Sequence, residues 1–198
     1  MRREILTSAI AIVALTVLLG VIFPLFVTGV SQVAFPGNAN GQKVFVGGRL
    51  VGSKIIGQNF AGKPRYFQSR PSATVPANNA AATTFSNLGP NSVITKKVIA
   101  ANIAAYIKLN KRFDPGLTAG KVPVDAADTS ASGVDPQISV ANGNIQAHRV
   151  AEVRGLSLAR VDALISQNTS GRGLGFSGEP GVNVLELNLA LDRIGKGR

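Results

Sequence analysis

Residues Ile5 to Val30 read ILTSAIAIVALTVLLGVIFPLFVTGV, and this stretch decides how the remainder of the chain is arranged. Its 26 residues carry no charge, and 16 of them are Leu, Ile, Val or Phe. As a helix it would measure about 39 Å at 1.5 Å per residue, against a hydrocarbon core of about 30 Å. The stretch therefore predicts one transmembrane helix over residues 5–30, which Pro24 would kink and not end.

A cleaved signal peptide is the alternative, because Arg2 and Arg3 precede the apolar run. The apolar region of such a peptide is usually about 7–15 residues long and ends at a small-x-small site. Here the run is longer and continues into Ser31-Gln32-Val33-Ala34, which favours a permanent anchor.

Charge around the span predicts its orientation. Arg2, Arg3 and Glu4 precede it, and no charge follows it until Lys43. The positive-inside rule then keeps residues 1–4 in the cytoplasm and sends the later residues across. We expect a single-pass protein of the cell inner (plasma) membrane with an extracytoplasmic C-terminal domain.

The span also contains residues that interrupt its bulky surface, namely Gly20, Pro24, Thr28 and Gly29. Small residues let neighbouring helices approach closely in lipid. Gly20, Pro24 and Gly29 are therefore predicted to pack against a transmembrane partner.

Composition restricts the chemistry that residues 31–198 can perform. They hold 19 Lys and Arg against 9 Asp and Glu, with no Cys and with His148 as the one histidine. Cys nucleophiles, Cys-based zinc sites and multi-histidine metal sites are therefore excluded. The basic residues are scattered and there is no Trp, which disfavours nucleic-acid binding. Contact with anionic lipid, contact with an acidic partner, or a merely solvated basic surface explains the positive charge better.

Residues 31–42 are rich in Pro, Gly and Asn and predict a linker, so residues 43–198 form the domain. Gly47-Gly48 lies between two short apolar runs, 43–46 and 49–51, and predicts a β-hairpin. Residues 55–60 and 66–68 are candidate strands, and residues 76–86 read as loop.

Three helices are expected in this domain. Residues 92–109 place Ile94, Val98, Ala101, Ala105 and Leu109 on one stripe. The second helix covers residues 140–154 between a Ser139 cap and Gly155. Ser157 caps the third, which turns Leu158, Val161, Leu164 and Ile165 inward. A loop over 114–138 would need packing or a partner to order it.

Residues 182–192 alternate apolar and polar side chains and predict a half-buried strand, although the part from Leu189 onward can turn helical. Strands at both ends of the domain with helices between them indicate one mixed α+β domain after the transmembrane helix.

Two stretches match phosphate-binding patterns but fail on context. Gly57 to Lys63 matches a P-loop up to its lysine, but Pro64 replaces the Ser or Thr that Mg²⁺ requires. Residues 173–178 match a dinucleotide fingerprint but follow a helix instead of a strand. We interpret both as turns.

Acid-base candidates are weak. His148 and Glu152 lie four residues apart on one helix face and can pair, but no nucleophile or oxyanion site accompanies them. Asp125, Asp128 and Asp135 can gather around a cation, yet they lack calcium-loop spacing and suit turns and caps better.

Six stretches taken in this order behind an N-terminal span resemble one family, the C subunit of the bacterial Kdp potassium-transporting ATPase. They are 52–60, 66–73, 86–90, 132–139, 149–151 and 178–192. The chain departs from the family pattern at Ala131, Val134 and Asn91-Ser92.

The resemblance implies a non-catalytic accessory subunit that supports assembly and turnover of a high-affinity potassium uptake complex. A P-type ATPase subunit would hydrolyse ATP and a channel-like subunit would conduct K⁺. The family has been described as raising the pump's affinity for ATP, whereas the predicted topology allows ATP contact only through the pump subunit. A membrane-anchored extracytoplasmic enzyme of unknown substrate is the alternative.

The resemblance also implies a set of structural or partner-contacting positions. These positions are Gly57, Gln58, Arg70, Pro71, Ser72, Asn87, Leu88, Gly89, Pro90, Asp135, Pro136, Arg149, Glu179, Pro180, Asn183 and Asn188. We expect no catalytic residue, metal site or nucleic-acid partner, and the sequence assigns no residue to a cofactor.

Overall fold

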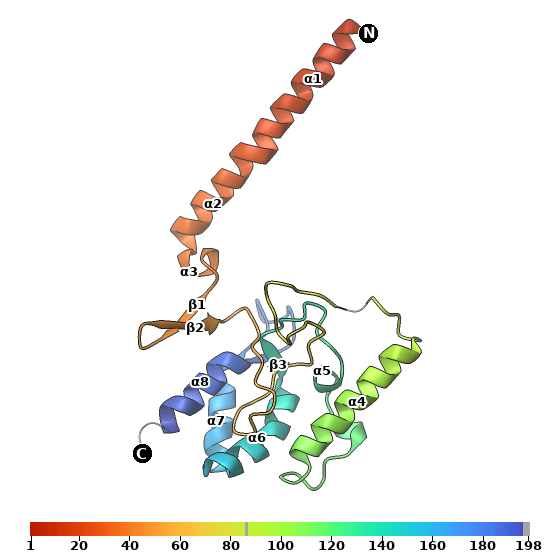
Figure 1. The fold of residues 1–198 in the computed structure, drawn as a ribbon. Helices are drawn as coiled ribbons and strands as arrows, with labels where there is room; N and C mark the ends of the chain where they lie inside the picture. The colour runs from red at the N-terminus through yellow and green to blue at the C-terminus, as the bar shows by residue number, and fades with distance from the viewer. Residues whose placement is uncertain (86, 196–198) are drawn as a thin grey trace. The chain divides into compact units, whose positions relative to one another are not determined.

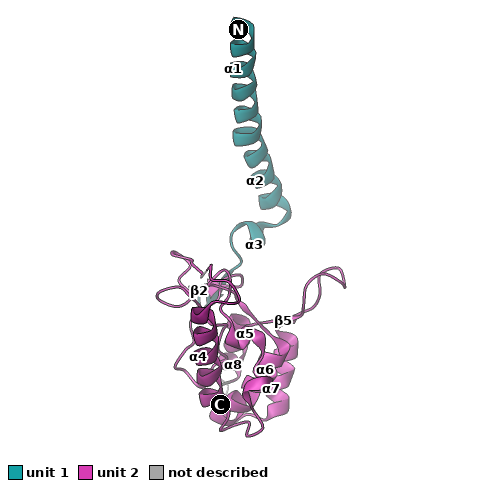
Figure 2. Ribbon diagram, turned by 90° about the vertical axis from the view of Figure 1, so that its right-hand side faces the viewer, with its two compact units in different colours: residues 1–51 teal, residues 52–198 magenta. Residues whose placement is uncertain are grey.

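The computed structural model describes residues 1–85 and 87–195. Ser86, which opens one of the family stretches, lies outside the described residues. The chain divides into two compact units, Met1–Val51 and Gly52–Arg198 (Figure 2). An apolar helix lies in the first, and helices with a small sheet lie in the second, which confirms the predicted fold class (Figure 1).

The first unit begins with a continuous helix that contains no buried residue. It consists of α1 (Arg2–Val17), a π-helical turn (Leu18–Ile22) and α2 (Phe23–Ala34). In the π turn the Phe23 N–H bonds to the Leu18 carbonyl, just before Pro24, which has no N–H to donate. The Thr28 hydroxyl donates to the Pro24 carbonyl at 2.8 Å. The helix therefore passes through Pro24 as predicted, and its apolar side chains are exposed as lipid contact requires.

A short helix and a hairpin follow. Helix α3 (Pro36–Ala39) is one turn within the predicted linker. Strands β1 (Lys43–Val46) and β2 (Arg49–Ser53) pair around Gly47 and Gly48, whose φ angles are +58° and +77°. Both angles lie in the left-handed region that glycine adopts freely, and the predicted hairpin is confirmed.

The second unit has a three-stranded antiparallel sheet in the order β3-β5-β4. Its strands are β3 (Gln137–Ser139), β4 (Thr169–Ser170) and β5 (Gly181–Asn183), with Ile138 and Thr169 both opposite Val182. Its helices are α4 (Val93–Asn110), a 3-10 turn (Ala119–Lys121), α5 (Val124–Ala127), α6 (Val140–Arg154), α7 (Leu158–Gln167) and α8 (Val184–Gly195).

Serine caps begin the three predicted helices. The Ser92, Ser139 and Ser157 hydroxyls each accept from the backbone N–H three residues later. Gly155 ends α6 at φ +65°, which is a left-handed C-cap. These contacts confirm the predicted helices to within a few residues.

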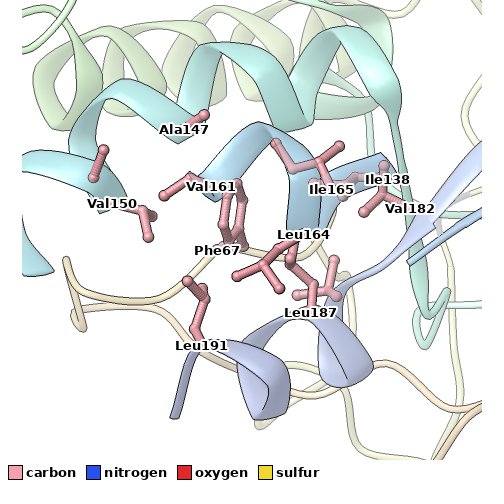
Figure 3. Close-up of a cluster of buried hydrophobic side chains, with 12 residues drawn as sticks. Phe67, Ile138, Ala147, Val150, Val161, Leu164, Ile165, Val182, Leu187 and Leu191 are labelled. Carbon is pink, nitrogen blue, oxygen red and sulfur yellow. The ribbon is translucent and has the colours of Figure 1, made fainter. Parts of the chain in front are cut away.

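The hydrophobic core lies where α6, α7 and α8 meet, with Phe67 among them (Figure 3). Val161, Leu164 and Ile165 are buried as expected, whereas Leu158 is 37% exposed at the start of α7. The buried cluster consists of Phe67, Ile138, Ala147, Val150, Ala151, Val161, Leu164, Ile165, Val182, Val184, Leu187 and Leu191. The stretch expected to be a loop over 114–138 contains the 3-10 turn, α5 and the start of β3, and its Leu117 and Ser130 are buried.

The strand predicted over 182–192 is confirmed only at its start, and the turn to helix comes at Val184 and not at Leu189. Strand β5 ends at Asn183, whose side-chain oxygen accepts from the Glu186 N–H at 3.1 Å and so starts α8. Val184, Leu187 and Leu191 are then buried at helical spacing. The alternating leucines fit the two-residue period of a strand and also the spacing of a helix. The Asn183 cap and the core packing select the helix.

The strands predicted over 55–60 and 66–68 are wrong. The backbone of Phe67 bonds to the Asn188 side chain, which accepts from its N–H at 2.9 Å and donates to its carbonyl at 3.0 Å. The backbone of Gln68 bonds to the Gln146 side chain in the same way, at 2.7 and 3.2 Å. Side-chain amides thus take the place of a neighbouring strand.

The apolar stripe of α4 is not its packed face. Ile94 is 59% and Val98 42% exposed, and Ala101 and Ala105 are exposed as well. The less exposed side of the helix carries polar groups such as Tyr106 and Asn110 beside half-buried isoleucines.

Candidate functional site

A cleft of about 230 Å³ lies between α4 and the segment 58–78. Amide, hydroxyl and small apolar side chains supply most of its lining. The lining residues include Gln58, Asn59, Gln68, Ser69, Arg70, Ser72, Asn78, Asn102, Tyr106, Asn142 and Gln146. Four of the family positions, Gln58, Arg70, Pro71 and Ser72, thus line one wall, and we take this cleft as the candidate site.

Its floor is a chain of hydrogen bonds joining α4 to α6. Tyr106 donates through its hydroxyl to Asn142 Oδ1 at 2.8 Å, and Gln146 Nε2 donates to the same oxygen at 2.8 Å. The Asn142 amide donates in turn to Asp125 Oδ2 at 2.9 Å. Burial, followed by the nearby Asp125 carboxylate, raises the pKa of Tyr106, so its hydroxyl stays a donor.

Asp125 also anchors the start of α6. Its carboxylate accepts from the Ser139 N–H at 2.8 Å and from the Ser139 hydroxyl at 2.7 Å. A negative charge at a helix N-terminus is favourable, because it faces unpaired N–H groups and the positive end of the helix dipole. Asp125 therefore acts as a structural anchor.

Arg149 is fully buried behind this floor, and its guanidinium bonds to neutral acceptors. It donates to Asn110 Oδ1 at 3.0 Å, to Gln146 Oε1 at 2.8 Å and to the backbone carbonyls of Pro64 and Tyr66. Burial lowers the pKa of Arg149 to about 10, which still leaves it charged at neutral pH. One side chain thus ties α4, α6 and the segment after residue 63 together.

An ion pair closes the rim of the cleft. Arg70 Nη1 lies 2.9 Å from Asp135 Oδ2. The Ser72 hydroxyl donates to the Gly133 carbonyl at 2.6 Å, and the Gly57 N–H donates to the Val134 carbonyl at 2.7 Å. A Cβ on Gly57 would collide with the Asp135 carbonyl oxygen. Family positions far apart in sequence therefore lie together here.

The remaining family positions lie away from the cleft rim. Asn183 donates to the Lys54 carbonyl at 2.7 Å, and the Pro136 carbonyl accepts from the Val184 N–H at 3.1 Å. Glu179, next to Pro180, accepts two bonds of 2.9 Å from Arg172 at the base of an exposed hairpin. Asn87, Leu88, Gly89 and Pro90 are exposed ahead of α4.

The structure places His148, Glu152 and Asp128 away from the cleft, whereas Asp125 belongs to its floor and Asp135 to its rim. His148 and Glu152 are both exposed on α6, and no ion pair joins them in the described part of the chain. Asp128 is exposed, and Asp125 and Asp135 have the separate roles given above. Within residues 1–85 and 87–195, no group of three acidic or histidine side chains is placed to hold a metal ion.

Both phosphate-like stretches are turns. Residues 61–66 turn through Gly62 at φ +76° and lead into no helix. Gly173 and Ser177 exchange backbone bonds of 2.7 and 2.8 Å across a hairpin tip. Neither place has the helix N-terminus that a phosphate group requires.

The sequence contains a signal for the floor of the cleft. Asn102, Tyr106 and Asn110 recur every four residues on α4, and Asn142 and Gln146 do so on α6. A polar stripe on an otherwise apolar helix predicts a hydrogen-bonded contact with another element.

The chain is similar to known proteins over nearly its whole length. The family model for KdpC, the K⁺-transporting ATPase c chain, matches residues 5–193. A protein of Methylibium petroleiphilum named potassium-transporting ATPase KdpC subunit is 50% identical over 193 residues, covering 97% of this chain and 98% of the relative. The KdpC subunits of Mycobacterium bovis BCG and Koribacter versatilis are 45% and 43% identical, covering 98% and 97% of this chain and 100% and 95% of their own.

One described helix, Arg2–Ala34, is long and apolar enough to cross a membrane, as a single-pass subunit requires. The family model covers the apolar helix, the cleft and the C-terminal helix alike. The chain therefore belongs to the KdpC family, a subunit of the K⁺-transporting ATPase.

Proposed function

We propose that this chain is a non-catalytic accessory subunit of the potassium-uptake complex, supporting assembly and turnover of its P-type ATPase and channel-like subunits. The observation that carries this proposal is that family positions in the second unit, Gly52–Arg198, make structural contacts. We call this unit the outer unit. Arg149, Asn183 and Asn188 hold the unit together through hydrogen bonds, and Arg70 with Asp135 braces the cleft. ATP hydrolysis then belongs to another subunit.

The outer unit lies on the extracytoplasmic side of the cell inner membrane, with residues 1–4 in the cytoplasm. The support is the charge asymmetry of Arg2 and Arg3 against the uncharged stretch 5–42. On this side the chain meets no cytoplasmic ATP and holds no cofactor of its own. Any effect on the pump's ATP affinity is transmitted through the pump subunit.

Activity measurements on the complex test the accessory role. Complexes with and without this chain should differ in yield or in K⁺-stimulated ATPase rate. His148→Ala in an intact complex should retain the wild-type rate, because His148 is exposed and has no ion pair with Glu152. A lost rate with assembly unchanged would support the extracytoplasmic enzyme instead.

Thiol labelling tests the orientation. Ser170 is exposed in β4, and the chain has no cysteine, so Ser170→Cys carries a single reporter thiol. A membrane-impermeant maleimide should label it in intact cells whose outer membrane has been made permeable. Labelling only after the inner membrane is broken would place the unit in the cytoplasm and favour direct ATP contact.

The span is proposed to pack against a partner subunit as well as to anchor the chain. A Cβ on Gly29 would meet nothing within 4 Å, and one on Gly20 would meet only Thr16, at 3.9 Å. The helix surface there has room for a neighbouring helix. Exchange of residues 5–30 for an unrelated span of equal length should reduce co-purification with the pump subunits, and unchanged recovery would locate assembly in the outer unit alone.

A further inference from the structure

Helix α4 has an exposed apolar strip that the outer unit leaves uncovered. Its residues are Ile94, Val98, Ala101 and Ala105, and Ala105 also lines the cleft. The eleven residue steps from Ile94 to Ala105 make the strip about 17 Å long. Within the 18 residues of α4 only Asn110 is fully buried. Apolar side chains that gather on one exposed face of a helix mark a candidate interaction surface.

The charges beside the strip have a single sign. Lys96, Lys97 and Lys108 are exposed on α4, and the helix contains no Asp or Glu. None of these lysines has a salt bridge within the described residues. Lys97 and Lys108 lie on the exposed arc of the helix beside the strip, so a complementary surface carries carboxylates.

The size of the side chains favours protein over lipid as the occupant. Helices that lie in a membrane interface present bulky Trp, Phe and Leu side chains to the acyl region. The strip presents two alanines and two β-branched residues. Such a surface allows the backbone of another helix to approach closely, with its ridges between those of α4.

We propose that the α4 strip is a docking surface for another subunit of the same complex, which contributes an apolar helix flanked by carboxylates. This inference rests on the proposed function, because it names the surface through which the accessory subunit assembles. It also explains why the strip follows helical spacing although the isolated chain does not bury it.

Paired valine variants in the assembled complex test the strip. Val98 and Val153 are helical valines of nearly equal exposure, 42% and 41%, and Val153 lies on α6 and not on the α4 strip. Val98→Glu should lower co-purification of the partner subunits at least about tenfold at matched dilution, whereas Val153→Glu should leave it unchanged. Lys97→Glu should lower it about two- to fivefold, as expected for an exposed charge pair.

Photo-crosslinking identifies the occupant without depending on those variants. A benzophenone maleimide attached to Ile94→Cys in native membranes should form a covalent adduct with a protein of the complex. Adducts with lipid alone, or no adduct, would overturn the proposal.

Equal recovery with Val98→Glu and Val153→Glu, or unchanged recovery with Lys97→Glu, would also count against it. If even the wild-type chain fails to recover the other subunits, the proposed function itself fails. If the wild-type chain recovers the other subunits and the strip variants recover them equally well, only the proposed α4 surface is refuted.

Discussion

Replacing Asn188 by Leu removes a side chain that acts as a strand partner for Phe67. Both residues are buried, and the Asn188 amide bonds to the N–H and to the carbonyl of Phe67 at 2.9 and 3.0 Å. Leucine has a similar volume but can neither donate nor accept, so two backbone groups lose their partner. At about 1–3 kcal/mol for each orphaned group, the free energy of unfolding should fall by about 2–6 kcal/mol. That is a large part of the roughly 5–15 kcal/mol expected for such a domain.

Urea unfolding of the full chain in detergent, followed by tyrosine fluorescence, measures this change. With a slope of about 2 kcal/mol per molar urea, the midpoint should fall by about 1–3 M. Asn144→Leu is the matched control, because Asn144 is exposed on α6 and should change stability by no more than about 0.5 kcal/mol. A midpoint for Asn188→Leu within the range of that control would refute the reasoning, since the Phe67 backbone would then have found water or another partner.

Gly57→Ala should destabilise the second unit, Gly52–Arg198, by about 1–3 kcal/mol, because its methyl group meets the Asp135 carbonyl. Gly89→Ala, where nothing lies within 4 Å of the new Cβ, should leave the same urea midpoint unchanged. Tyr106 of the folded chain should not ionise near pH 10, because burial raises its pKa, and burial also raises the pKa of Tyr66 above its ordinary value. The folded state then keeps protons that the unfolded state releases, so stability is lost as pH rises above about 10. Absorbance at 295 nm with Tyr66→Phe as reference checks this, and a Tyr106 transition near pH 10 in folded protein would contradict it.

Local signals predicted the elements that depend on neighbouring residues. Gly47-Gly48 supplies the left-handed angles of a tight turn, and Ser139 with Gly155 supplies both caps of α6. Each of these signals acts between residues that are close in the chain, so the sequence alone is enough to predict the turn or the cap. The long apolar run over 5–30 is likewise sufficient to predict a helix that needs no buried side.

The cleft was not predicted, because its parts come from segments 40 to 80 residues apart. Arg149 and Gln146 were recognisable only as polar residues on a helix, and nothing local says that they bind Asn110 and Gln68. The ion pair of Arg70 and Asp135 spans 65 residues in the same way. Family resemblance marked several of these positions without giving the contacts they make.

The sequence by itself determined the membrane-spanning helix, the hairpin, the capped helices and the mixed α+β class, since each follows from local composition and periodicity. Tertiary structure decided between strand and helix after Asn183, because the alternating leucines satisfied both periods until the core buried Val184, Leu187 and Leu191. It also decided that the segment through Phe67 is extended without being a strand. Its backbone groups are satisfied by an amide 121 residues away, a partner that only the folded chain supplies.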